Sequence, residues 1–170
     1  MRAALRDTTK TTAMIIFVMI GATIFSVIFR RLGGDEMVIH AFDALGTGPY
    51  FVLFIIMALV FVLGFFLDWV EIALVVVPLV APVVASLDFG LPQNQVLAWF
   101  AIALAVNMQT SFLTPPFGYA LFYLRGVATG ISIGTIYRGA VPFVILQLLA
   151  LILLITFPQI SLWLPGYLSR

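Results

Sequence analysis

The chain has 170 residues, of which 64% are hydrophobic and 9% are charged, and its mean hydropathy is +1.22. Soluble domains are roughly 45–50% apolar and about 25% charged, so this chain lacks the polar side chains that cover a surface in water. The composition excludes a water-soluble enzyme, a nucleic-acid-binding protein and a disordered tail. A net charge of +1 indicates no polyanionic partner. The sequence predicts an all-α protein of the lipid bilayer, with about five to six membrane segments at roughly 20 residues each.

Charged residues mark the ends of the first predicted segments, because Lys, Arg or Asp at the bilayer centre costs about 2.5–3.5 kcal/mol. Residues 1–31 predict a first helix, whose apolar part ends at Arg30 and Arg31. Residues 32–49 are too polar to span the bilayer, but their apolar side chains recur at helical spacing. They therefore predict a short amphipathic helix in the membrane interface.

Residues 50–88 predict a membrane helix followed by a broken or hairpin element. After the first apolar run come Asp68 and Glu71, and the next run is short and interrupted by Pro78 and Pro82. Two interpretations of Asp68 remain open. Either it lies in an aqueous loop between two antiparallel helices, or it faces a cavity in a re-entrant turn inside the protein.

Residues 89–125 predict a helix that is broken within the membrane. Two consecutive prolines lack amide hydrogens and clash with the carbonyls one turn back, so the helix opens there. Freed carbonyls are costly in lipid, and such a break survives only where it is buried or lines a cavity. Its polar and helix-breaking residues are Asn107, Gln109, Thr110, Ser111, Thr114, Pro115, Pro116 and Gly118.

This cluster has the composition of a cation site. In many secondary transporters, unwound carbonyls and half-helix C-terminal ends bind Na⁺, and hydroxyl and amide oxygens suit a hard cation. The cluster has no carboxylate, which suits a monovalent ion. We predict a cation site with Thr110, Ser111 and Thr114 as candidate Na⁺ ligands. The alternative is a proline-kinked helix whose hydroxyls bond to their own backbone.

Residues 126–170 predict a second interfacial segment and the last helix. The segment from Gly126 to Tyr137 is rich in glycine and hydroxyl residues. The run from Gly139 to Pro158 is apolar and long enough to span the bilayer. Pro142 is expected in the first turn of that helix, where proline is tolerated.

Three motifs carry a resemblance to a known family. Thr114-Pro115-Pro116-Phe117-Gly118 resembles the TPP-x-G signature of the large membrane subunit of tripartite ATP-independent periplasmic (TRAP) transporters. Gly64-Phe65-Phe66-Leu67-Asp68, followed by two prolines, resembles that family's G-x-F-x-D segment. The segment from Tyr137 to Phe143 also resembles the C-terminal part of that family's sequences. The resemblance extends from Lys10 to Pro165, and the residues of these segments are most similar to those of the mannitol/chloroaromatic or 2-oxo-acid branch.

The resemblance implies an elevator-type carrier of the ion transporter superfamily, built from two inverted repeats in the bacterial inner membrane. It implies Na⁺-coupled import of small organic acids, with a small membrane subunit and a periplasmic substrate-binding protein as partners. No cofactor is implied apart from Na⁺ as the coupling ion. Gly64 and Asp68 would belong to one discontinuous element, and Thr110, Ser111, Thr114, Pro115 and Gly118 to the other.

The chain departs from the family in its length. The G-S-S/A-A-T and P-P-S segments of a first half are not found in these 170 residues. We therefore expect one membrane domain, the second repeat, from a split or truncated gene or one piece of an assembly. Its partner would be the first half of the large subunit, and the chain is not expected to transport alone. Substrate-binding residues are not identified.

Two other functions compete with transport. A non-catalytic membrane scaffold predicts that the polar residues of 107–118 tolerate apolar replacement. An intramembrane enzyme is disfavoured, because the sequence has no Cys and a single His, His40, in a loop-like segment. Its Asp residues are also unpaired, which leaves no nucleophile–base pair.

Overall fold

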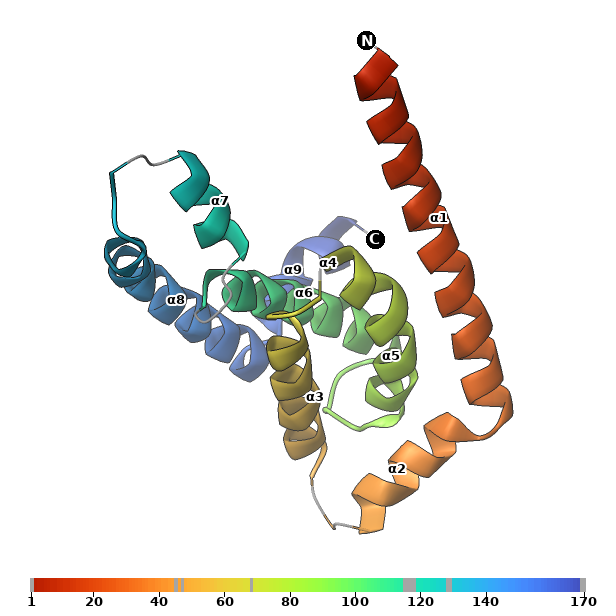
Figure 1. Cartoon of the computed structure of the whole chain (residues 1–170). Helices are drawn as coiled ribbons and strands as arrows, with labels where there is room; N and C mark the ends of the chain where they lie inside the picture. Colours follow the sequence, from red (N-terminus) through yellow and green to blue (C-terminus); the bar gives the residue numbers. More distant parts are fainter. Residues whose placement is uncertain are drawn as a thin grey trace.

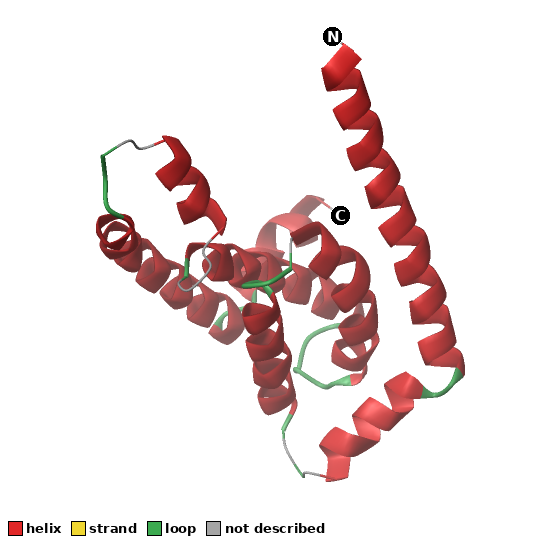
Figure 2. Ribbon diagram, in the orientation of Figure 1, coloured by secondary structure: helices red, strands yellow, loops and turns green. Residues whose placement is uncertain are grey.

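The computed structural model describes residues 2–44, 46, 48–67, 69–114, 119–127 and 130–168. Within these ranges the regular elements are helices and there is no strand (Figure 2), which confirms the predicted all-α fold. In chain order the elements are α1 (Arg2–Arg31), α2 (Gly34–Ala44), α3 (Pro49–Leu63), α4 (Trp69–Glu71), the π-helix η1 (Ile72–Val76), α5 (Val77–Ser86), α6 (Gln93–Leu113), α7 (Tyr119–Val127), α8 (Ile133–Thr156) and α9 (Gln159–Leu168).

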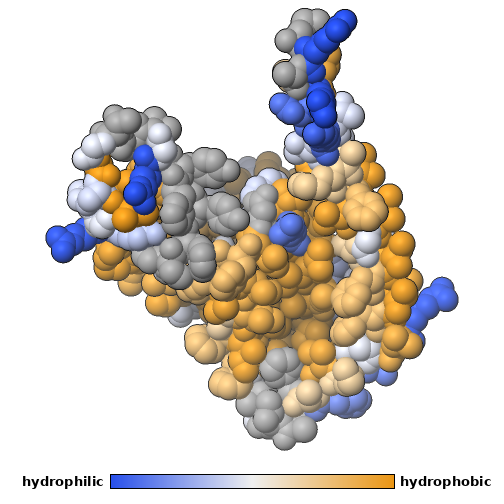
Figure 3. All heavy atoms as spheres, viewed as in Figure 1, coloured by the Kyte–Doolittle hydropathy of each residue, from blue (hydrophilic) through white to orange (hydrophobic). Residues whose placement is uncertain are grey.

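Four helical stretches of the described chain are long and apolar enough to cross a membrane, and α3 is a shorter apolar helix. Figure 3 shows hydrophobic residues over most of the visible face, with hydrophilic ones gathered mainly at the N-terminal end of α1 and on the rim. A surface of this kind requires a lipid environment. The four stretches are Ala4–Arg31, Trp69–Ser86, Gln93–Leu113 and Ile133–Thr156.

The helix α6 lies at the centre of the fold. In Figure 1, α1 runs along one side of the molecule, α7 and α8 form the other side, and α3, α5 and α6 lie between them. Trp99 of α6 is buried, and its indole N–H donates to the Leu154 carbonyl of α8 at 2.8 Å. Its ring also packs edge-on against Phe89, with ring centroids 5.1 Å apart. These contacts fix α6 against its neighbours.

The helix after Glu71 differs from the prediction that prolines break it. Helical structure continues from Trp69 to Ser86, through both Pro78 and Pro82. Pro78 lies in the first turn of α5, where its missing amide costs little. Just before it, η1 forms a wider turn in which the Val77 amide bonds to the Ile72 carbonyl. The wider turn gives the proline ring room that a regular α-helix lacks.

The last long helix begins earlier than the sequence predicts. α8 starts at Ile133, because Ser132 caps it and its Oγ accepts a hydrogen bond from the Thr135 amide at 3.2 Å. The predicted interfacial segment therefore ends within the first turns of α8. Pro142 lies inside this helix rather than in its first turn. The hydropathy pattern did not predict this start, because a capped helix can begin outside the hydrocarbon layer.

Candidate cation site

The polar residues near the end of α6 form a single stripe. Asn107, Thr110, Ser111 and Thr114 are three or four residues apart, a spacing that places them on one helix face. Asn107 is 3% exposed, and Thr110 and Ser111 are fully buried. The stripe faces α3, because the Asn107 Nδ2 donates to the Met57 carbonyl at 2.9 Å. Polar groups are thus kept inside the protein and away from lipid.

The three hydroxyls of the stripe donate to carbonyls of their own helix. Thr110 Oγ1 bonds to Val106 at 2.8 Å, Ser111 Oγ to Met108 at 2.7 Å, and Thr114 Oγ1 to Thr110 at 2.8 Å. This pattern is the one that the proline-kinked alternative predicts. A hydroxyl has one hydrogen and two lone pairs, however, so each oxygen still has lone pairs for a cation. The pattern is compatible with both interpretations.

The helix α6 stops at Leu113 instead of continuing as a straight membrane helix. Thr114 is extended, with φ −94° and ψ 132°, the conformation that a following proline favours. The two prolines after it have no amides with which to bond the Ser111 and Phe112 carbonyls. The Thr114 amide bonds to the Ser111 carbonyl at 3.2 Å. At the end of α6 the Ser111 carbonyl is thus bonded in a tighter turn, and neither it nor the Phe112 carbonyl has the partner four residues on that a continuous helix would give it.

The helix α3 ends against the same turn of α6. Gly64 is the C-cap of α3, and its amide bonds to the Val60 carbonyl at 2.8 Å. A Cβ atom built on Gly64 would overlap Ser111 Oγ and would lie 2.9 Å from Ser111 Cβ. This is closer than real Cβ contacts, so the approach of α3 to α6 requires glycine at this position.

Two helix C-terminal ends therefore meet at Gly64 and Ser111. Each helix C-terminus carries about half an elementary negative charge, located on its last carbonyls. Two such ends in contact make a region of negative potential without any ionised carboxylate. Together with the Ser111 and Thr114 hydroxyl oxygens, this region can bind a small monovalent cation by ion–dipole attraction.

The structure brings together five of the eight residues proposed for the site. Asn107, Thr110, Ser111 and Thr114 share one face, and Gly64 touches Ser111. Three others, Asp68, Pro115 and Gly118, lie outside the described residues, so both interpretations of Asp68 stay open. The sequence did not predict the Met57 carbonyl as the partner of Asn107, because every residue has a backbone carbonyl.

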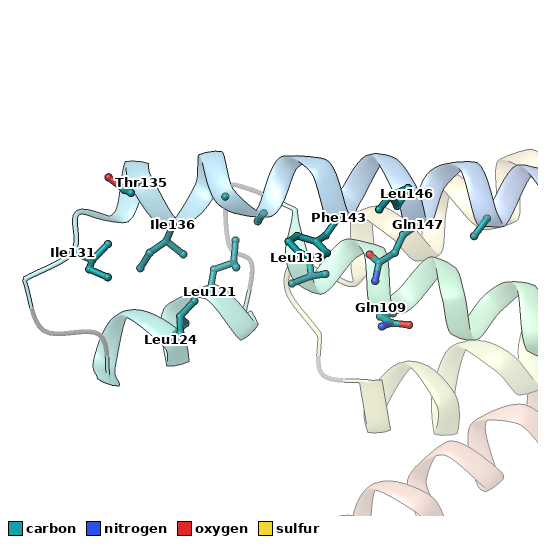
Figure 4. Close-up of a pocket in the computed structure, with 13 residues that line it drawn as sticks. Gln109, Leu113, Leu121, Leu124, Ile131, Thr135, Ile136, Phe143, Leu146 and Gln147 are labelled. Carbon is teal, nitrogen blue, oxygen red and sulfur yellow. The ribbon is translucent and has the colours of Figure 1, made fainter.

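A pocket of about 720 Å³ lies on another side of α6, between α6, α7 and α8. In Figure 4 the amides of Gln109 on α6 and Gln147 on α8 face one another beside Leu113 and Phe143. Gln147 Oε1 is buried and has no hydrogen-bond partner among the described residues. Gln147 was not among the predicted site residues, although a single amide in an otherwise apolar stretch of helix is a visible signal.

Comparison with known proteins points to one family. Residues 1–160 match the family described as tripartite ATP-independent periplasmic transporter, DctM component. The chain is 34% identical over 162 residues to an ectoine/5-hydroxyectoine TRAP transporter large permease protein of Ruegeria pomeroyi, covering 93% of this chain and 36% of the relative. It is 30% identical over 161 residues to a sialic acid TRAP transporter large permease protein of Vibrio cholerae, covering 95% and 36%.

A third relative shows the same partial coverage. The chain is 31% identical over 157 residues to a sialic acid TRAP transporter permease protein of Haemophilus influenzae, covering 92% of this chain and 24% of the relative. The chain therefore spans 24% to 36% of the length of these three relatives.

Proposed function

Because the chain belongs to the DctM family of tripartite ATP-independent periplasmic transporters, we propose that it forms part of a transporter permease and holds the coupling cation where α3 meets α6. The family consists of transporter permeases rather than enzymes, and with its four candidate membrane spans the chain is a multi-pass protein of the bacterial inner membrane. The observation that carries the proposal is the contact of Gly64 with Ser111, which joins two helix C-terminal ends.

In this proposal the chain is one repeat, the C-terminal half, of a large permease subunit. Its partial coverage of longer relatives supports a piece of a larger subunit, and the C-terminal placement follows from the resemblance of its motifs. The first half, a small membrane subunit and a periplasmic substrate-binding protein complete the transporter. The substrate is a small organic acid, as in relatives named for sialic acid and C4-dicarboxylates. The mannitol/chloroaromatic or 2-oxo-acid branch is the specific assignment that the motifs favour.

The coupling ion in this proposal is Na⁺. Neutral hydroxyl and carbonyl oxygens of Thr110, Ser111 and Thr114 provide dipoles for a monovalent ion rather than the charge that a divalent ion needs. A bound cation also offsets the repulsion between the like ends of α3 and α6. Binding of the ion would therefore hold the C-terminal end of α3 against α6, which links ion occupancy to the packing of these two helices.

The test uses the assembled permease with its binding protein in liposomes, and measures uptake against external Na⁺ concentration. Ser111→Ala and Thr114→Val each remove one candidate ligand oxygen. We expect the Na⁺ concentration for half-maximal uptake to rise about tenfold for each, which corresponds to about 1.4 kcal/mol. Unchanged Na⁺ dependence in both variants would contradict the cation role.

Matched controls separate a ligand from a local backbone bond. Ser161→Ala and Thr156→Val remove hydroxyls that donate to nearby backbone carbonyls, as Ser111 and Thr114 do. Ser161 donates to the Pro158 carbonyl just before α9 at 2.9 Å, and Thr156 to the Ile152 carbonyl of α8 at 2.8 Å. We expect both controls to keep the Na⁺ dependence of the unmodified permease. An equal change in the controls and the site variants would mean that the hydroxyls act only on their helices.

The scaffold function remains the competing proposal, and the bonds of the three hydroxyls to their own backbone are the pattern that a purely structural role would also produce. It predicts that Thr110→Val leaves both assembly and uptake intact. The transport proposal predicts normal assembly with weakened Na⁺ dependence. Uptake and co-purification of the subunits, measured on the same preparation, distinguish the two.

A further inference from the structure

A groove of about 380 Å³ separates α1 from the helical segment formed by η1 and α5, here called the hairpin arm. It lies on the α1 side of the molecule, away from α7 and α8 (Figure 1). Ser26, Arg30 and Arg31 line it from α1, and Leu74 and Pro78 line it from the hairpin arm. We call it the α1 groove.

The α1 groove contains a hydroxyl that has no partner. Ser26 is 6% exposed, and its Oγ is buried without a hydrogen-bond partner among the described residues. Thr23, which also lines the groove, instead donates to the Met19 carbonyl of its own helix at 2.8 Å. A buried hydroxyl without an acceptor is unfavourable, and lipid tails offer none. An occupant with an acceptor oxygen would satisfy Ser26.

The mouth of the groove carries positive charge at the level of the lipid headgroups. The exposed Arg30 and Arg31 follow directly on the apolar part of α1, so they lie where that helix leaves the hydrocarbon layer. Ser26 is about 6 Å deeper, one helical turn at 1.5 Å per residue. The headgroup layer is itself about 5–7 Å deep on each side of a bilayer. The two guanidinium groups therefore adjoin the headgroup layer, and Ser26 lies one turn below it, on the hydrocarbon side.

We propose that the α1 groove binds the headgroup of an anionic phospholipid. The phosphate accepts charge-assisted hydrogen bonds from Arg30 and Arg31, and a deeper oxygen of the same headgroup accepts from Ser26 Oγ. The acyl chains continue along Leu74, Pro78 and the exposed apolar face of α1. The site is independent of the proposed cation site.

The test measures lipid retention by the purified full chain in detergent, using native mass spectrometry. The probes are phosphatidylglycerol, zwitterionic phosphatidylcholine and inorganic phosphate. We expect at least one phosphatidylglycerol to be retained about tenfold more tightly than phosphatidylcholine. Phosphatidylglycerol has a net negative charge that the two guanidinium groups attract, whereas the net charge of phosphatidylcholine is zero. Equal retention of both lipids would overturn the proposal, and so would inorganic phosphate binding as tightly as phosphatidylglycerol.

Variants locate the bound lipid. The double substitution Arg30→Gln with Arg31→Gln is expected to abolish the preference for phosphatidylglycerol. The matched control, Arg2→Gln with Arg6→Gln, removes the same charge from the other end of α1 and is expected to keep it. Equal losses in the two double variants would show attraction by net charge alone and would overturn the proposal.

A third variant tests the end of the groove that contains Ser26. Ser26→Ala leaves all charges in place and removes only the unpartnered hydroxyl. We expect the affinity for phosphatidylglycerol to fall about fivefold, as for one lost hydrogen bond to a neutral oxygen. An unchanged affinity in Ser26→Ala would contradict the assignment of this groove.

Discussion

The neighbouring helices α6 and α8 are buried to very different extents. Of its membrane-spanning window, α6 has 44% of residues buried in the protein, whereas α8 has 11%, although α8 is the more hydrophobic of the two. A soluble protein would bury the more hydrophobic helix. In a bilayer, lipid accepts apolar side chains as well as protein does, and only protein can pair polar groups. Polarity therefore marks the interior of this molecule.

The amides of the two helices illustrate the same difference. Asn107 on α6 is bonded to a carbonyl of α3, while Gln147 Oε1 on α8 is buried without a partner among the described residues. The first amide joins two helices of this chain. The second lies on a helix that remains largely uncovered. The α3–α6 contact is therefore already complete within this chain. Three pairs of substitutions compare buried contacts of α6 with positions on the more exposed helices.

The largest effect is expected for Gly64→Ala at the contact with Ser111. The added methyl group must separate α3 from α6, and overpacking of this kind costs about 3 kcal/mol in free energy of unfolding. Thermal or denaturant unfolding in detergent measures it. Gly139→Ala on α8 is the control, because a Cβ there meets no atom within 4 Å. An equal loss in both variants would remove the proposed distinction between the two helices.

A smaller effect, different in the two helices, is expected when each amide is replaced by leucine. Asn107→Leu breaks a buried bond between α3 and α6, and we expect a loss of about 1–2 kcal/mol in unfolding free energy. Gln147→Leu removes an acceptor without a partner in the part of the chain that the structure describes, so stability of the isolated chain should stay constant or rise. Destabilisation by Gln147→Leu as large as that by Asn107→Leu would contradict the comparison.

The smallest effect is expected for Trp99→Phe, which keeps an aromatic ring and removes the indole bond from α6 to the Leu154 carbonyl. We expect a loss of about 1 kcal/mol, the usual net contribution of one hydrogen bond. Trp163→Phe is the control, because Trp163 is 63% exposed. The same unfolding measurement should show no change for the control, and a matching loss there would contradict the role of the indole bond.

Local chemistry made several elements predictable from the sequence. Arg30 and Arg31 mark the end of α1, because charges are expelled from the hydrocarbon layer, and the double proline explains why α6 stops at Leu113. The stripe from Asn107 to Thr114 follows from helical periodicity alone. Such features depend on neighbours in the sequence, which is why the sequence reveals them.

Features that depend on packing or on a single cap were not predictable. The start of α8 is set by Ser132, which a hydropathy pattern does not distinguish from a loop residue. The residues alone did not place Gly64 against Ser111. Only the family resemblance assigned them to paired elements, and their contact depends on how α3 approaches α6. The unpartnered oxygen of Gln147 likewise appears only once the helices are assembled.

The π-helix η1 accommodates an extra residue without rotating the helix that follows it. Each residue of an α-helix advances the side-chain direction by about 100°, so an extra residue in a regular helix would turn every later side chain around the axis, whereas a wider turn absorbs it. Val83 and Val84 of α5 are fully or almost fully buried with η1 in place. Deleting one residue of 72–76 and restoring a regular turn would keep both valines facing the core, but it would remove the room beside Pro78. The segment thus separates the length of this helix from the direction of its buried face.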